Sequence, residues 1–200
     1  MAPFVVNPDA VREFKDLKSL EKWYARNHAK ATEFWIKLHK KGSGLPSVTN
    51  VEALDAALCW GWIDGIRKSF DDRSFLQRYT PRTKNSIWSQ VNIAHIERLR
   101  KAGRMQPAGE AQVELAKADG RWAKAYGGFS GEQFPADLLA AIEAEPKALE
   151  LFQSLTAQNR YSLGFRTHQM KTAAGREKKI AGFVEMLKRG ETIYPNGKAK

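Results

Sequence analysis

Residues 63–80 have the sequence IDGIRKSFDDRSFLQRYT, which predicts a β-hairpin. Ile66 and Lys68 alternate with Arg67 in the first half, and a second alternating run follows from residue 75 to residue 79. A period of two is typical of strands. Asp71 and Asp72 supply the turn between them. A hairpin alone is marginally stable in water, so we expect at least one more strand beside it.

Residues 33–40 predict that strand. Phe34, Ile36 and Leu38 fall on one side of it, while the intervening positions carry Trp35, Lys37 and His39. Together with the hairpin, this strand predicts a small antiparallel sheet. Residues 1–18 predict an extended arm that leads into the fold.

Helical patterns flank the sheet. Ser19 predicts the cap of a helix over 19–29. Thr49 and Glu52 form a capping box for a second helix that ends near Gly61. Further helices are expected over 86–102 and 107–118, and the predicted core contacts of the first of these are Trp88, Val91, Ile96 and Leu99. The fold class is therefore α+β, a small antiparallel sheet with flanking helices.

The C-terminal part predicts a helical module that follows this core. Four helical patterns cover 135–144, 146–155, 157–172 and 176–189. We expect an α+β core domain over 1–126, a Gly-rich linker over 127–134, a helical module over 135–190 and a basic tail over 191–200 that frays.

Composition and charge restrict the class of protein. Hydrophobic residues make up 42% and charged residues 28%, which are values of a globular chain. No apolar run approaches the about 18 residues of a membrane span. The start of the chain has no signal-peptide pattern, so a cytoplasmic protein is expected. Cys59 is the single cysteine, and its expected state is a buried, inert thiol.

The net charge of +11 is unevenly distributed. Residues 67–104 carry ten basic and three acidic side chains, and residues 160–200 carry the same numbers. An acidic stretch separates the two blocks. Such blocks attract nucleic acid, anionic lipid or phosphorylated ligands, but they also serve as solubilising charge. The four histidines lack metal-ligand spacing, and no nucleotide-binding motif occurs, so neither a metal nor a cofactor is expected.

The segment from residue 78 to residue 92 carries the strongest functional pattern. It leads from a strand into the predicted helix start, where free backbone N–H groups favour anions. Arginine and lysine side chains lie close by, and Asp64 in the hairpin is placed to orient Arg78 or Arg82. The candidate ligand-binding residues are Asp64, Arg78, Arg82, Lys84, Ser86, Trp88, Ser89 and Asn92. The alternative is that these residues only cap, pair and pack.

Several motifs resemble the YdeI/OmpD-associated family, also known as bacteriocin-protection proteins. They are ALDAALCWGWIDG at 53–65, TPR at 80–82, SIWS at 86–89 with Asn92, GRMQPAG at 103–109, and ADGRW at 118–122 with Ala125 and Tyr126. Arg160, Tyr161 and the helix over 176–190 resemble the family's terminal helical module. The resemblance implies a link to cationic antimicrobial peptide resistance and to an outer-membrane porin as a candidate partner. It implies no reaction.

The leading hypothesis is a non-enzymatic binding protein of this type, linked to envelope or antimicrobial-peptide stress. Its site would be the cationic helix start, its ligand a small anion, and no residue is assigned a catalytic role. A first alternative is an enzyme in which Asp64 is the base and Ser86 or Ser89 holds an anionic substrate. A second alternative is nucleic-acid binding through the two basic blocks.

Overall fold

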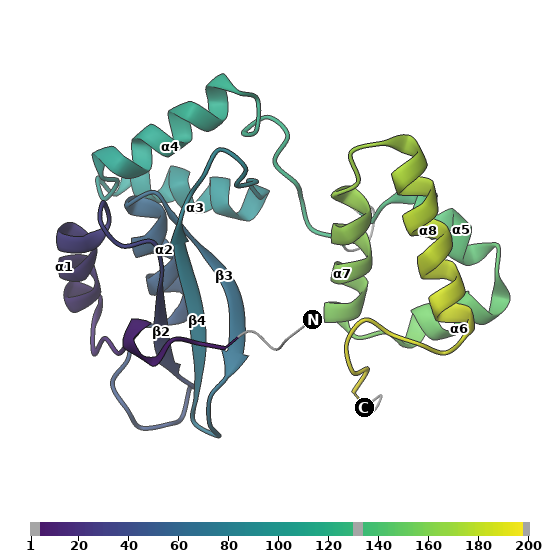
Figure 1. Cartoon of the computed structure of the whole chain (residues 1–200), viewed down its shortest axis with the longest axis horizontal. Coiled ribbons are helices and arrows are strands. Elements are labelled where there is room, and N and C mark those ends of the chain that lie inside the picture. Colours follow the sequence, from purple (N-terminus) through teal and green to yellow (C-terminus); the bar gives the residue numbers. More distant parts are fainter. Residues whose placement is uncertain (1–4, 130–133, 198–200) are drawn as a thin grey trace. The chain divides into compact units, whose positions relative to one another are not determined.

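The computed structural model describes residues 5–129 and 134–197 of the chain. The chain divides into two compact units, unit 1 over Met1–Tyr126 and unit 2 over Gly127–Lys200 (Figure 1). Unit 1 contains the sheet and unit 2 consists of helices, in agreement with the predicted α+β class. Positions 130–133 of the predicted linker lie outside the described residues.

The sheet of unit 1 has four strands in the order β1-β2-β4-β3. The predicted hairpin is confirmed as β3 (Trp62–Ser69) and β4 (Ser74–Pro81), and β2 (Phe34–His39) pairs antiparallel with β4. The three predicted strands pair antiparallel as expected, and a fourth, unpredicted strand makes the sheet mixed. Inside the predicted arm, the 3-10 helix Pro8–Ala10 is followed by β1 (Val11–Arg12), which runs parallel to β2.

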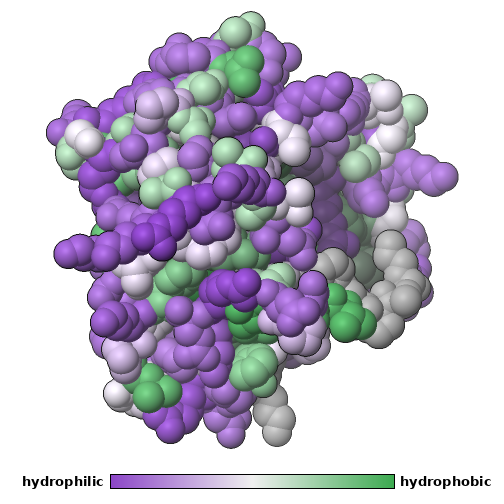
Figure 2. Space-filling model, turned by 60° about the vertical axis from the view of Figure 1, so that its left-hand side comes forward, coloured by the Kyte–Doolittle hydropathy of each residue, from purple (hydrophilic) through white to green (hydrophobic). Residues whose placement is uncertain are grey.

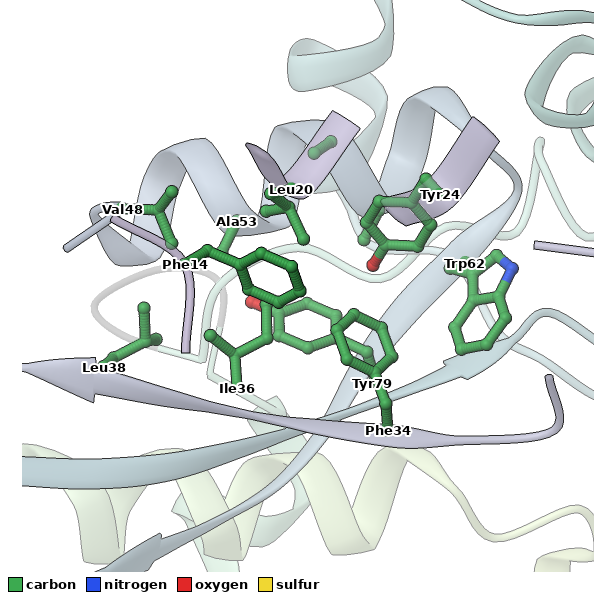
Figure 3. Close-up of a cluster of buried hydrophobic side chains, with 12 residues drawn as sticks. Phe14, Leu20, Tyr24, Phe34, Ile36, Leu38, Val48, Ala53, Trp62 and Tyr79 are labelled. Atoms are coloured by element: carbon green, nitrogen blue, oxygen red, sulfur yellow. The ribbon is translucent and has the colours of Figure 1, made fainter. Parts of the chain in front are cut away.

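Two helices cover one face of this sheet, α1 (Leu17–Asn27) and α2 (Asn50–Cys59). Aromatic rings fill the space between helices and strands, as Figure 3 shows for Tyr24, Phe34 and Tyr79. The capping box of α2 is confirmed. The predicted cap of α1 is wrong, because Asp16 caps the helix through the Ser19 backbone N–H and Ser19 lies inside it.

Helix α2 also packs against α3 (Gln90–Lys101) and α4 (Pro107–Ala118). Small side chains allow this close packing. A Cβ atom added at Gly109 of α4 would lie 2.2 Å from the Cys59 carbonyl oxygen, so only glycine fits there. Within α2, Asp55 is a buried charged residue, 4% exposed.

Helix α3 starts four residues later than predicted, because Ser89 caps it. Its side-chain oxygen accepts the Asn92 backbone N–H, whereas residues 83–86 form a separate turn. The predicted core contacts at Trp88, Ile96 and Leu99 are confirmed. The prediction for Val91 is wrong, since the later start turns this side chain outward and leaves it 60% exposed.

Unit 2 contains α5 (Ala136–Glu143), α6 (Pro146–Ser154), α7 (Ala157–His168) and α8 (Ala173–Lys188). Thr172 caps α8, which starts three residues earlier than predicted. The expectation of a frayed tail is wrong as far as Asn196. The buried Asn159 side chain bonds the backbone of Tyr194, and the Asn196 side chain bonds the backbone at Ser154 and Thr156.

Exposed apolar side chains are scattered over the surface. On the face in Figure 2, hydrophilic residues predominate and apolar ones form small separate groups. Large exposed apolar residues such as Val51, Ile66 and Val91 belong to different elements of unit 1. Isolated exposures of this kind are normal for globular proteins and do not mark an interface.

Candidate functional site

Arg82 lies at the centre of the candidate site, directly after β4. Its backbone N–H donates to the Gly61 carbonyl, and its side chain is turned inward, leaving the residue 5% exposed. The guanidinium carbon lies 3.5 Å from the ring centroid of Trp88, and Nη1 donates to the Ile87 carbonyl over 3.1 Å. Among residues 5–129 and 134–197, no acceptor bonds the buried Nε and Nη2 of Arg82. The chain thus buries a cation with part of its hydrogen-bonding capacity unused.

Burial has an electrostatic consequence for this cation. It lowers the pKa of Arg82 to about 10, although the negative charge of Asp64 acts in the opposite direction. The positive charge of Arg121 adds to the lowering of that pKa. The lowered pKa means that burial disfavours the charged form of Arg82. An anion beside the guanidinium would offset this cost.

Asp64 on β3 faces the same region. It pairs in register with Tyr79 of β4, and the residue as a whole is exposed. The protein nevertheless displaces enough water from its carboxyl group to raise the Asp64 pKa, against the opposing influence of Arg82, Arg67 and His95. In the described part of the chain, Asp64 forms no ion pair within 4.0 Å.

A short turn over residues 83–86 adjoins Arg82. The Ser86 hydroxyl accepts the Thr83 backbone N–H, so Ser86 caps this turn instead of the helix. Arg121 holds the turn from outside, through Nη1 to the carbonyls of Thr83 and Ser86 at 3.3 and 2.9 Å. Lys84 on the turn is exposed.

The start of α3 is occupied by the chain's own acceptors. The Gln90 N–H donates to the Tyr126 carbonyl over 2.8 Å, and the Asn92 N–H donates to the Ser89 side chain over 3.1 Å. The prediction of a helix start near Ser86 is therefore wrong. At its actual position these two N–H groups of the first turn are already bonded, so they do not form an open anion cradle.

Arg78 is separate from the other candidates. Its Nε donates to Glu33 over 2.8 Å, and the two side chains form an ion pair. Because strand side chains alternate, Arg78 points to the opposite face from Tyr79 and hence from Asp64. The prediction that Asp64 orients Arg78 is wrong. The structure thus places Arg82 against Trp88, with Asp64 close enough to act on the pKa of Arg82, and pairs Arg78 with Glu33 instead.

The sequence interpretation missed a polar cluster formed between α2 and α3. Asp55 Oδ1 lies 2.6 Å from His95 Nδ1, and Arg98 Nη2 donates to both Asp55 oxygens at 2.7 and 2.8 Å. His95 is close enough to act on the pKa of Asp64. One signal was available, because Asp55 interrupts an otherwise apolar helix. The partners on α3 were not predictable without the packing of α2 on α3.

Several other sequence predictions concern chemistry outside this region. Cys59 is buried, and this burial raises its thiol pKa to about 11, as expected of an inert thiol. Within residues 5–129 and 134–197, no three His, Cys, Asp or Glu side chains are grouped to hold a metal. None of the helices in the described part of the chain has the length and apolar character that a membrane crossing requires.

Fold and site define a two-unit protein, an α+β unit with a buried cationic corner followed by a helical unit. Residues 12–112 match the family described as Domain of unknown function (DUF8412), and residues 133–190 match the family described as Bacteriocin-protection, YdeI or OmpD-Associated. The chain belongs to the first family, whose match covers half of it, and carries the YdeI or OmpD-associated module in unit 2.

The family resemblance predicted from the sequence is confirmed over residues 133–190. The motifs at 53–65, 80–92 and 103–109 instead fall within the region that matches the domain of unknown function. No curated protein and no solved structure is similar enough to this chain to count as a match.

Proposed function

We propose that unit 1 binds a small anion at the corner formed by Arg82, Trp88 and Asp64. The observation that carries the proposal is the Arg82 guanidinium, which is almost fully buried while Nε and Nη2 have no acceptor in the described residues. A buried donor without an acceptor costs free energy, so such donors are rare and call for an explanation. A ligand that accepts from both nitrogens supplies that explanation.

The planar guanidinium favours a carboxylate or a phosphate, because two oxygens of either group match its fork. Stacking on Trp88 holds the plane of the fork in place. Asp64 adds selectivity, because its carboxylate repels a second negative charge and accepts from a hydroxyl or amine. The preferred ligand is therefore a monoanion with a neighbouring hydrogen-bond donor, such as a 2-hydroxy acid.

Access to this site requires a local rearrangement. Arg82 Nε and Nη2 are shielded from solvent, and the exposed turn over residues 83–86 adjoins them. This turn is held by hydrogen bonds of its own residues and by Arg121. Its outward movement opens a path to the guanidinium, so ligand association is slower than diffusion allows.

Isothermal titration calorimetry of the full chain with inorganic phosphate and with glycolate tests the proposal. The wild type is expected to bind both, and Arg82→Met to bind at least tenfold more weakly. Arg104→Met is the matched control, because Arg104 is partly exposed and paired with Glu21 in the same unit. Equal affinities in the two variants, or no binding by the wild type, contradict the proposal.

The module in unit 2 connects this binding function with protection against cationic antimicrobial peptides. The support is the family match over residues 133–190, whose description names bacteriocin protection. In bacteria that express the chain, survival of cationic peptide exposure is expected to exceed that of cells expressing Arg82→Met at equal protein level. Equal survival would mean that the anion site does not contribute to protection.

A second candidate function is acid–base catalysis on the bound anion. It is favoured by the unpaired Asp64 carboxyl of raised pKa and by the nearby His95, whose ring is oriented by Asp55. General acid–base catalysis needs titratable groups of this kind beside the substrate. Turnover of p-nitrophenyl phosphate or acetate that disappears in Asp64→Asn supports it, whereas binding without turnover leaves the non-enzymatic function.

Nucleic-acid binding through the two basic blocks is less favoured. In the first block, Arg78, Arg98, Arg100 and Arg104 form ion pairs with acidic residues from other parts of unit 1. These pairs reduce the charge available for phosphate contacts. Steeply salt-dependent binding of a DNA duplex in fluorescence anisotropy would restore this alternative.

A further inference from the structure

Unit 2 contains a pocket that the function of unit 1 does not use. Its volume is about 750 Å³, within the range of about 300–1,000 Å³ that holds small molecules. Residues of α5, α6 and α7 line it, together with Gly128, Phe129, Phe134 and Leu155. The aromatic lining residues are Phe129, Phe134, Phe152 and Tyr161.

The aromatic side chains make the lining of the pocket largely apolar. The centroids of Phe134 and Phe152 lie 5.3 Å apart, and Phe129 meets Tyr161 edge-on at 5.5 Å. Phe129 is buried, while Tyr161 is 42% exposed and lies where the pocket meets solvent. This arrangement favours the apolar body of a ligand in the interior and its polar part near the surface.

Arg160 is the charged side chain among the described lining residues. Its Nη2 donates to the Gln153 carbonyl, and its guanidinium carbon lies 5.4 Å from the Phe152 ring centroid. Within the described ranges, no carboxylate pairs with Arg160, and its Nε has no acceptor. The wall of an apolar pocket thus carries a positive charge without a counter-ion.

We propose that this pocket binds a small amphipathic acid. Such a ligand carries one anionic group on an apolar body that contains a ring. The anionic group pairs with Arg160, whose fork matches a carboxylate, and the body packs between Phe134, Phe152 and Tyr161. An amphiphile of the same shape with a cationic group is rejected, because it would be placed beside a like charge. This site is independent of the anion corner in unit 1.

Two ligands of similar shape and opposite charge, 4-phenylbutyrate and 4-phenylbutylamine, test whether binding requires an anionic group. Each is titrated into the full chain in competition with 8-anilinonaphthalene-1-sulfonate, whose fluorescence reports occupancy of apolar sites. The acid is expected to displace the probe at a concentration at least tenfold below that of the amine. Equal displacement by acid and amine overturns the proposal.

Two variants locate the site. Arg160→Gln is expected to weaken the acid about tenfold and to bring the amine closer to the acid in affinity, whereas the control Arg189→Gln, exposed on the same unit, changes neither. Ala157 is exposed and lines the pocket, so Ala157→Trp fills it without removing a core contact. Loss of probe and acid binding in Ala157→Trp supports the site even where Arg160→Gln does not fold. Retained binding in Ala157→Trp overturns it, and phosphate binding through Arg82 is unaffected either way.

Discussion

Replacing Arg82 by methionine separates a ligand-binding arginine from a structural one. A structural arginine stabilises the fold, so its loss destabilises unit 1. An arginine retained for ligand binding contributes little in the free protein, because its burial offsets its contacts. Methionine keeps most of the apolar stem and its packing on Trp88 while removing the charge.

The expected size of the effect follows from three contributions. The lowering of the Arg82 pKa to about 10 corresponds to a net electrostatic cost of about 3 kcal/mol for the charged form. Stacking on Trp88 at 3.5 Å returns about 2 kcal/mol, and the hydrogen bond to the Ile87 carbonyl about 1.5 kcal/mol. These contributions nearly cancel, so Arg82→Met should change the free energy of unfolding by about 1 kcal/mol or less.

Urea unfolding monitored by tryptophan fluorescence measures this change. All six tryptophans precede residue 127, so the signal reports unit 1 alone. Wild type and Arg82→Met are expected to be nearly equal in stability without ligand, with a difference that grows when phosphate is added, because only the wild type binds it. A loss of about 3 kcal/mol or more without ligand would identify Arg82 as a structural residue.

Three further predictions concern unit 1. Asp55→Asn should lower its stability by about 2–3 kcal/mol in the same urea assay, since a buried carboxylate loses charged hydrogen bonds to His95 and Arg98. Gly109→Ala should prevent correct folding, seen as insoluble protein or a lost cooperative transition, because its Cβ would lie 2.2 Å from a carbonyl oxygen. The raised pKa of Asp64 means that the folded state binds this proton more tightly than the unfolded state, so its charge costs stability as pH rises above 3.8. Asp64→Asn should therefore be more stable than wild type at pH 7, with a smaller difference at pH 4.

Each of these three predictions has a control variant or an outcome that would contradict it. Asp119→Asn removes an ion pair whose carboxylate is 45% exposed and should cost less than about 1 kcal/mol. Gly182→Ala, with open space around the added Cβ inside α8, should stabilise unit 2 by about 0.5–1 kcal/mol by circular dichroism. A well-folded Gly109→Ala protein would contradict the packing of α4 on α2. An Asp64→Asn variant less stable than wild type at pH 7 would contradict the assignment of a desolvated carboxyl.

Local pattern predicted most of the architecture. The hairpin, the strand over 33–40 and the capping box at Thr49 and Glu52 depend on neighbours in sequence, and each is confirmed. The two-residue strand β1 was missed because its parallel pairing with β2 depends on tertiary contact, not on its own periodicity. Helix starts shifted where several polar residues compete to cap, as with Asp16 against Ser19 and Ser89 against Ser86.

The candidate site was predicted only in part, for a similar reason. Arg82, Trp88 and Asp64 were identified by residue type and spacing. Whether a given arginine turns inward depends on what surrounds it: Arg78 meets Glu33, which is 45 residues away, whereas Arg82 meets the ring of Trp88. Such partners come from packing, so no local pattern shows which arginine keeps free donors.

The most direct test of the anion corner observes the Arg82 side chain itself. Nitrogen-15 NMR of the arginine Nε–Hε groups, with the Arg82 signal assigned by its loss in Arg82→Met, follows this group during a phosphate titration. If the anion binds Arg82, the Arg82 resonance shifts downfield and saturates at phosphate concentrations that leave the resonance of the exposed Arg189 unchanged. An Arg82 resonance that stays in place, or that shifts no more than Arg189, would contradict it.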